Sequence, residues 1–99
     1  MDDAHLVVLE HAYKHGLTED EIRYAWKNSF VKFARTDDVR GEVIAAFGPA
    51  GEREVIISID DCVGVLGRAE GMYVYIFHAS LPPVPTLRIE LENWRKEQS

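Results

Sequence analysis

The sequence has one cysteine, no long apolar run and no basic leader, and each absence narrows the class of protein. Cys62 has no second cysteine to pair with, so an internal disulfide is excluded and a reducing compartment is expected. The longest apolar segment, residues 72–79, has the length of a strand and is too short to cross a membrane. The first residues, Met-Asp-Asp-Ala-His, carry no basic stretch ahead of an apolar one, which argues against a secretory signal. We therefore expect a cytoplasmic protein without a membrane partner.

Positive charge is also scarce. The chain has 11 Lys and Arg against 17 Asp and Glu, which gives a formal net charge of −6. Proteins that bind nucleic acid are usually basic, because their cations displace the counterions of the phosphates. The composition therefore predicts that the cations gather on one face, or that the chain does not bind RNA unaided.

The first quarter of the chain predicts two helices separated by a glycine. Residues 5–15 carry apolar side chains at helical spacing, and Gly16 is placed to end that helix in the left-handed conformation. The second helix has a clear start, because Thr18 is placed as its N-cap and Glu21, three residues later, completes a capping box. This helix is expected to end near Asn28.

Beyond the helices the apolar residues alternate, which predicts strands. The strands are expected over residues 31–36, 42–47, 52–60 and 72–79. Residues 61–71 hold three glycines and are expected to form a loop, with a short strand around residues 63–65 as the alternative.

The C-terminal segment fits two structures. Its apolar residues suit a strand or a helix face, and we favour a helix that starts at about Thr86, just after Pro85. The expected fold class is α+β: two N-terminal helices packed on a small, mainly antiparallel four-stranded sheet, with a C-terminal helix. Ninety-nine residues are expected to form a single domain.

Several short motifs are spread in order over most of residues 8–83. They are His11-Ala12, His15-Gly16, the run Glu19-Asp20-Glu21-Ile22 that leads to Ala25, Gly48-Pro49, Glu54-Val55 and Phe77-His78-Ala79. Their order and spacing resemble the BrnT-related small bacterial toxins of the wider RelE-like group. The resemblance implies a pair of N-terminal helices on a small antiparallel sheet, cleavage of RNA, and silencing by the cognate antitoxin of a type II toxin-antitoxin pair. The relatives commonly have methionine where Ser80 stands and a basic residue in the Gly-Pro turn.

RNA cleavage without a metal or other cofactor requires a base for the 2′-hydroxyl proton, an acid for the leaving oxygen and a cation for the phosphate. His78 suits the acid or base role because histidine titrates near neutral pH. Glu54 can serve as the base or orient His78, and Arg53 or Arg68 can hold a phosphate through two hydrogen bonds. The catalytic candidates are therefore His78, Glu54 and Arg53. The candidates for substrate binding are Arg68, Lys32, His11 and Ser80.

Most of these candidates also have a purely structural interpretation. His78 can pack at the end of an apolar strand, and Arg53 and Glu54 can form a solvated strand edge. His11 and His15 stand four residues apart and can present two ligands to a metal. No Asp or Glu stands out as a third ligand, so no metal site is predicted, and His15 is expected to cap the first helix.

Other conspicuous residues are expected to be structural. The larger aromatic side chains are expected in the core or an interface rather than as base-stacking platforms. These residues are Trp26, Trp94, Tyr73 and Tyr75. Cys62 is expected to be unreactive, because acidic neighbours at Asp60 and Asp61 raise the pKa of a thiol.

Three functional hypotheses follow. The first is a toxin-like domain that acts on RNA and is restrained by an antitoxin. The second is a non-catalytic module that binds a protein partner, which the net charge of −6 favours. The third is a homodimer that pairs edge strands or the C-terminal helix. The first hypothesis is favoured if these cations cluster around His78: Lys14, Lys32, Arg35, Arg53 and Arg68.

Overall fold

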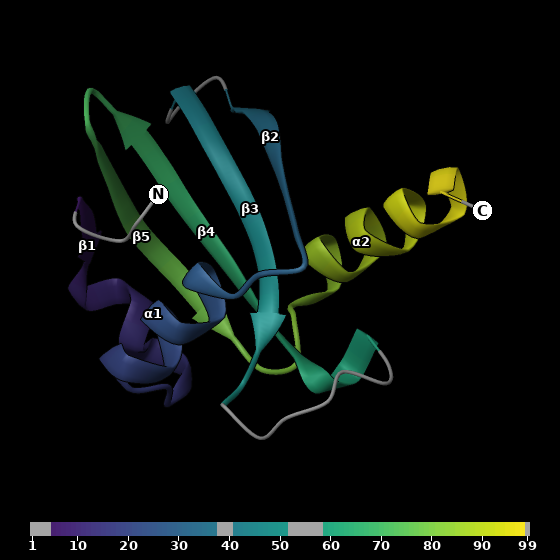
Figure 1. Ribbon diagram of the computed structural model, residues 1–99, viewed down its shortest axis with the longest axis horizontal. Helices are drawn as coiled ribbons and strands as arrows, with labels where there is room; N and C mark the ends of the chain where they lie inside the picture. Colours follow the sequence, from purple (N-terminus) through teal and green to yellow (C-terminus); the bar gives the residue numbers. More distant parts are fainter. Residues whose placement is uncertain (1–4, 38–40, 52–58, 99) are drawn as a thin grey trace.

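The computed structural model describes residues 5–37, 41–51 and 59–98 (Figure 1). The elements in chain order are β1 (Leu6–Val8), the 3-10 helix η1 (Glu10–His15), α1 (Glu19–Lys27), β2 (Val31–Asp37), β3 (Gly41–Pro49), the 3-10 turn η2 (Ile59–Asp61), β4 (Cys62–Glu70), β5 (Tyr73–Ser80) and α2 (Pro85–Gln98). The fold class is therefore α+β.

All the strands of the described chain belong to one mixed sheet. The sheet has five strands in the order β1-β5-β4-β3-β2. The four strands from β2 to β5 pair antiparallel with their sequence neighbours, as expected for short connections. β1 adds a fifth strand that runs parallel to β5, with Leu6 opposite Val74. The prediction of four strands was therefore one strand short.

The glycine-rich segment was wrongly predicted as a loop. Residues 62–70 form β4, which lies in the middle of the sheet between β3 and β5. A Cβ on Gly64 would lie 3.1 Å from Pro83 Cβ, and a Cβ on Gly67 would lie 2.7 Å from Val74 Cγ1. These glycines therefore mark close approach of neighbours rather than turns. Most of the strand expected over residues 52–60 lies outside the described residues, and its described end belongs to η2.

The first predicted helix is only partly confirmed. Leu6 and Val8 lie in β1, and only residues 10–15 are helical, in the tighter 3-10 form. Pairing with β5 overrides the helical spacing, because it buries Leu6 against the sheet. Gly16 ends η1 as predicted, with a φ of 89° and its N–H donating to the Tyr13 carbonyl at 3.1 Å.

The second helix was predicted correctly. The Thr18 N–H donates to Glu21 Oε1 at 2.8 Å, and the Glu21 N–H donates to Thr18 Oγ1 at 3.1 Å, which completes the capping box. α1 packs directly on the backbone of β3, because a Cβ on Gly48 would overlap the carbonyl group of Ala25. The contact fixes α1 against one face of the sheet.

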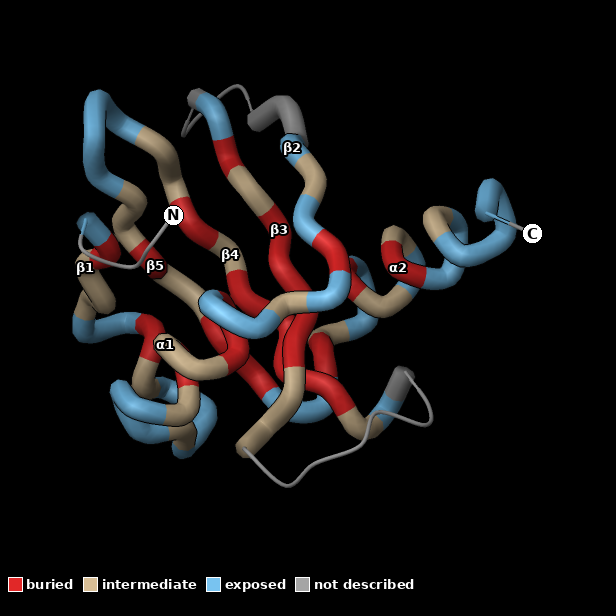
Figure 2. The backbone as a smooth tube through the Cα atoms, viewed as in Figure 1, coloured by how far each residue is buried: buried red, intermediate tan, exposed pale blue. Residues whose placement is uncertain are grey.

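The sheet carries a separate apolar cluster on each face, and we name the faces after their helices. On the α1 face, Ile22 and Trp26 pack against Ala46, Val65 and Ile76. Buried residues concentrate on the central strands in Figure 2.

On the α2 face, Leu87 and Leu91 pack against Val31, Phe47 and Cys62. The predicted C-terminal helix is confirmed, with Pro85 as its first residue. Within the described ranges no helix is long and apolar enough to cross a membrane.

Candidate functional site

A β-bulge in β5 decides which face of the sheet His78 meets. Leu66 of β4 pairs with His78, and the next residue, Gly67, pairs with Ile76. Phe77 is therefore an extra residue in β5, as in a β-bulge. In a regular strand His78 would lie on the same face as Ile76, in the core under α1. The bulge places His78 on the α2 face, beside Leu66.

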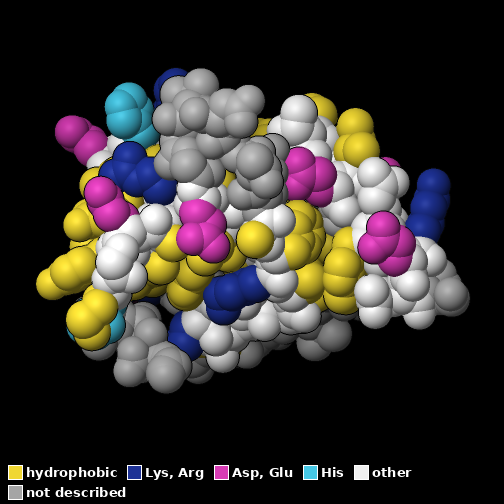
Figure 3. Space-filling view, turned by 90° about the horizontal axis from the view of Figure 1, so that it is seen from above, with side chains coloured by type: hydrophobic (Ala, Val, Ile, Leu, Met, Phe, Trp, Pro, Cys, Tyr) yellow, Lys and Arg dark blue, Asp and Glu magenta, His cyan; other side chains and the backbone are white. Residues whose placement is uncertain are grey.

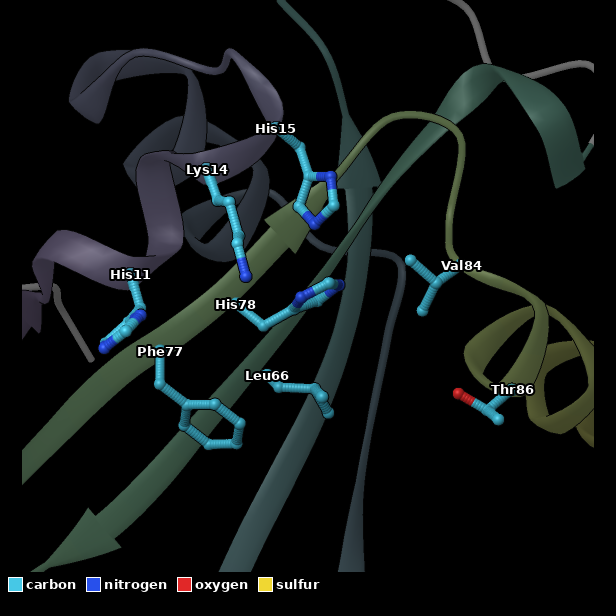
Figure 4. A pocket seen from close by; sticks show the side chains of 8 residues that line it. All are labelled: His11, Lys14, His15, Leu66, Phe77, His78, Val84 and Thr86. Carbon is cyan, nitrogen blue, oxygen red and sulfur yellow. The ribbon is translucent and has the colours of Figure 1, made fainter.

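His78 lies in an open pocket of about 520 Å³ on the α2 face, between η1 and the start of α2 (Figure 4). The pocket is lined by His11, Lys14, His15, Leu66, Phe77, His78, Val84 and Thr86. Among the lining residues that the structure describes, three are histidines, one is a lysine and none is acidic. The pocket is thus suited to an anion although the whole chain is acidic.

Two side chains of η1 converge on His78. The rings of His15 and His78 have centroids 5.2 Å apart and planes at 70°, an edge-to-face arrangement. Lys14 extends from η1 into the same space (Figure 4). The site therefore brings two imidazoles and one ammonium together from opposite ends of the chain.

The surroundings of His78 favour its neutral form. Partial burial lowers its pKa below the ordinary value of 6.5, and the positive charges of His15 and Lys14 lower it further. Its Nε2 lies 3.5 Å from the Oγ of buried Ser80, at the outer limit of a hydrogen bond. A neutral imidazole keeps one ring nitrogen free of a proton, so His78 can accept a proton near neutral pH.

The 3-10 geometry of η1 determines which of its side chains lie on the same side of the helix. A 3-10 helix has three residues per turn, so His11 and Lys14 lie on one side of it. In an α-helix His11 and His15 would align instead, as a metal pair requires. In the described part of the chain, no group of three or more His, Cys, Asp or Glu side chains is placed to hold a metal ion.

The predicted site residues are only partly brought together. His78 and His11 line the pocket, and Ser80 lies buried beside His78. Arg68 is on β4, two residues beyond Leu66, and does not line the pocket. Its guanidinium lies 3.4 Å from a Glu70 carboxylate oxygen.

Lys32 is turned away from the site. Its Nζ donates to the Trp26 carbonyl at 2.9 Å and to Ser29 Oγ at 2.8 Å, and lies 4.9 Å from the centroid of the Trp26 ring. Partial burial lowers the pKa of this lysine. Lys32 therefore helps to hold α1 on its own face of the sheet. The catalytic candidates Arg53 and Glu54 lie outside the described residues, as does the side chain of Arg35.

Lys14 and His15 were not among the predicted site residues. Lys14 appeared only among the cations tested for clustering, and His15 was interpreted as a helix cap. The available signal was that three of the four histidines, His11, His15 and His78, belong to the short motifs described above. These histidines come together because of the β-bulge in β5 and the position of η1, and no local sequence pattern predicts either feature.

Cys62 is excluded from the chemistry of the pocket. The side chain is buried in the α2-face cluster, and its pKa is raised to about 11. Burial is the largest cause, and the charges of Asp60 and Asp61 add smaller contributions in the same direction. The expectation of an unreactive thiol thus agrees with the structure, but its main cause is burial rather than the acidic neighbours.

Comparison with known proteins finds no match: no family model, no curated protein and no solved structure matches the chain. The function is therefore argued from the pocket and from the charge of the molecule.

Proposed function

We propose that this chain is a metal-independent endoribonuclease, a cytoplasmic toxin-like domain restrained by a cognate antitoxin. The observation that carries the proposal is the convergence of His78, His15 and Lys14 in a pocket whose described lining holds no acidic side chain. The resemblance to BrnT-related and RelE-like toxins supports RNA as the substrate and an antitoxin as the partner.

The three side chains supply the groups that the reaction needs. Neutral His78 takes the proton of the 2′-hydroxyl, and the 2′-oxygen then attacks the neighbouring phosphorus. The bond from phosphorus to the 5′-oxygen breaks, and His15 gives that oxygen a proton. Lys14 neutralises the negative charge that builds up on the phosphoryl oxygens. The products are a 2′,3′-cyclic phosphate and a 5′-hydroxyl, and no metal takes part.

The test is cleavage of a labelled single-stranded RNA in EDTA by the wild type, His78→Ala and Lys14→Ala. We expect His78→Ala to lose about a hundredfold or more in rate, the usual contribution of a general acid or base. Lys27→Ala is the matched control for Lys14→Ala, because Lys27 is exposed at the end of α1. Circular dichroism establishes that each variant is folded.

Two readouts extend the test. Product ends analysed by mass should carry the cyclic phosphate, and induced expression in a bacterial host should arrest growth with the wild type but not with His78→Ala. Cleavage by His78→Ala at the wild-type rate would contradict the assignment of the base.

A non-catalytic binding module is the second candidate. The net charge of −6 favours it, together with several large apolar side chains that are exposed in the described structure. These are Phe30, Met72, Tyr73, Leu81 and Ile89. A pure, folded wild-type protein that neither cleaves RNA nor arrests growth, but that forms a stable complex with a protein partner or a second copy, would favour this candidate.

A further inference from the structure

We infer that a strip of side chains beyond the pocket is a stacking platform for unpaired bases, so that the substrate is single-stranded RNA. This inference rests on the proposed function and extends it. The strip, here called the aromatic platform, consists of His5, Tyr73, Tyr75 and Arg68. The Tyr73 and Tyr75 ring centroids are 6.1 Å apart with planes at 30°, and His5 meets Tyr73 edge-on at 5.5 Å.

Arg68 completes the platform. Its guanidinium carbon lies 5.5 Å from the centroid of the Tyr75 ring. Tyr75 therefore contacts both Tyr73 and Arg68, and each of these two neighbours leaves a large part of its side chain open to solvent. Tyr73 is 47% exposed, and the Arg68 side chain is 41% exposed. Aromatic rings and arginine guanidinium planes are the two surfaces on which proteins stack unpaired bases.

The platform and the pocket share one face of the sheet. Tyr75 pairs with Arg68, and His78 pairs with Leu66 two residues earlier on β4. Residues directly opposite each other in a sheet, and residues two apart in one strand, point to the same face. The bulge at Phe77 keeps His78 in phase with the two tyrosines.

The distance between the aromatic platform and the pocket allows one RNA strand to contact both. Tyr73 and His78 are separated along β5 by about 16 Å, at roughly 3.3 Å per residue. Leu66 and Phe77 line the pocket at its near end, so the surface between platform and pocket is apolar. Seen from above, hydrophobic side chains are interspersed with charged ones over the surface of the molecule (Figure 3). A short extended oligonucleotide can thus stack on the platform while a phosphate occupies the pocket.

The charge of the chain favours stacking as the source of affinity. Glu70 lies against Arg68, so this region adds little net positive charge for phosphates. Stacking does not depend on charge, because every base has a π-face. A double helix buries its base faces and cannot use such a platform. Single-stranded RNA is therefore the occupant that fits both the acidic composition and the exposed rings.

The test measures binding by fluorescence anisotropy, with labelled oligonucleotides whose 2′-O-methyl groups block cleavage. We compare a single strand with bases, an abasic strand of the same length and charge, and a duplex. The wild type should bind the single strand about tenfold more tightly than the other two, as expected for one stacked base. Tyr73→Leu should remove that preference, whereas Tyr73→Phe should keep it.

Phe30→Leu is the matched control, because Phe30 is an aromatic residue of similar exposure (41%) that precedes β2, outside the platform. It should bind like the wild type. Equal binding of the abasic strand by the wild type would overturn the platform, as would unchanged binding by Tyr73→Leu. A Tyr73→Leu defect seen only in capture of a protein partner or in self-association would also overturn it, and would assign the strip to a protein interface.

His78→Ala separates this inference from the proposed function. That variant should keep the preference for the blocked single strand over the abasic strand while failing to cleave RNA. Binding that depends on Tyr73 without any cleavage by the wild type would support the platform and reject the ribonuclease. Cleavage that depends on His78 but is equally efficient in Tyr73→Leu would reject the platform alone.

Discussion

At the scale of single residues, His78 shows how position changes the chemistry of a side chain. The ring is partly buried and faces two cationic neighbours, His15 and Lys14, and all three effects disfavour its protonated form. The same three effects make His78 a base that is ready at neutral pH and a source of acid sensitivity.

This sensitivity gives a prediction for stability. Because the pKa of His78 is lower in the folded than in the unfolded chain, the unfolded chain binds more protons as the pH falls below about 6.5. The free energy of unfolding should therefore decrease as the pH drops from 7.5 to 5.5. Urea titrations at both values should show a larger decrease for the wild type than for His78→Gln.

The control for this prediction is His5→Gln, which replaces an exposed histidine outside the pocket. It should lose stability as steeply as the wild type. A wild type and His78→Gln with the same pH dependence would show that His78 titrates alike in both states.

The residue scale also shows the limit of prediction from sequence. His78 was identified from its type and its place at the end of an apolar strand, and it does line the pocket. Lys32 was predicted to bind the substrate at the same site, but strand alternation turns Lys32 onto the α1 face against Trp26. Residue type is visible in the sequence, whereas the face that a residue occupies depends on the register of the sheet.

At the scale of elements, the sequence predicted a helix that neighbouring residues determine and missed strands that depend on other segments of the chain. α1 was predicted because its capping box and the glycine before it are local signals. β1 is three residues long and exists because β5 is beside it, and β4 was hidden by glycines that fit close neighbours. Both strands depend on which other segments pack beside them, and a single sequence contains no direct record of those partners.

One contact between elements gives the next prediction. Gly48→Ala would drive a methyl group into the Ala25 carbonyl, where α1 rests on β3. Overpacking of this kind costs about 1–3 kcal/mol of stability, or more when backbone must move. Gly51→Ala is the matched control, because nothing lies within 4 Å of the added methyl. Thermal melts should show a large loss for Gly48→Ala and little change for Gly51→Ala, and equal melts would contradict direct helix-strand contact.

At the scale of the whole molecule, the acidic net charge and the cationic groups of the pocket act in opposite directions. Under the proposed function, the net charge of −6 opposes RNA binding at long range, and the phosphate contact in the pocket acts only at short range. Binding should therefore rely on few ionic contacts.

The number of ionic contacts can be measured from salt dependence. For a single strand, the slope of log affinity against log salt is about −0.7 per phosphate neutralised. We expect a shallow wild-type slope of about −1 to −2. Lys14→Ala should reduce its magnitude by about 0.7, whereas Lys27→Ala should leave it unchanged. A steep slope would show that many cations contact the strand and would contradict a platform based on stacking.

The pairing of β1 with β5 also has a consequence for the timing of assembly. Translation releases β1 and η1 first, but their partner strand is the last strand of the sheet to be made. A nascent chain therefore holds Lys14 and His15 without His78 until almost the whole domain has been synthesised. Contacts between such distant segments also form more slowly, because closing a long loop costs entropy. The three side chains of the proposed catalytic site are thus not assembled in the growing chain at the ribosome, so the ribonuclease activity that we propose would begin only after the sheet is complete.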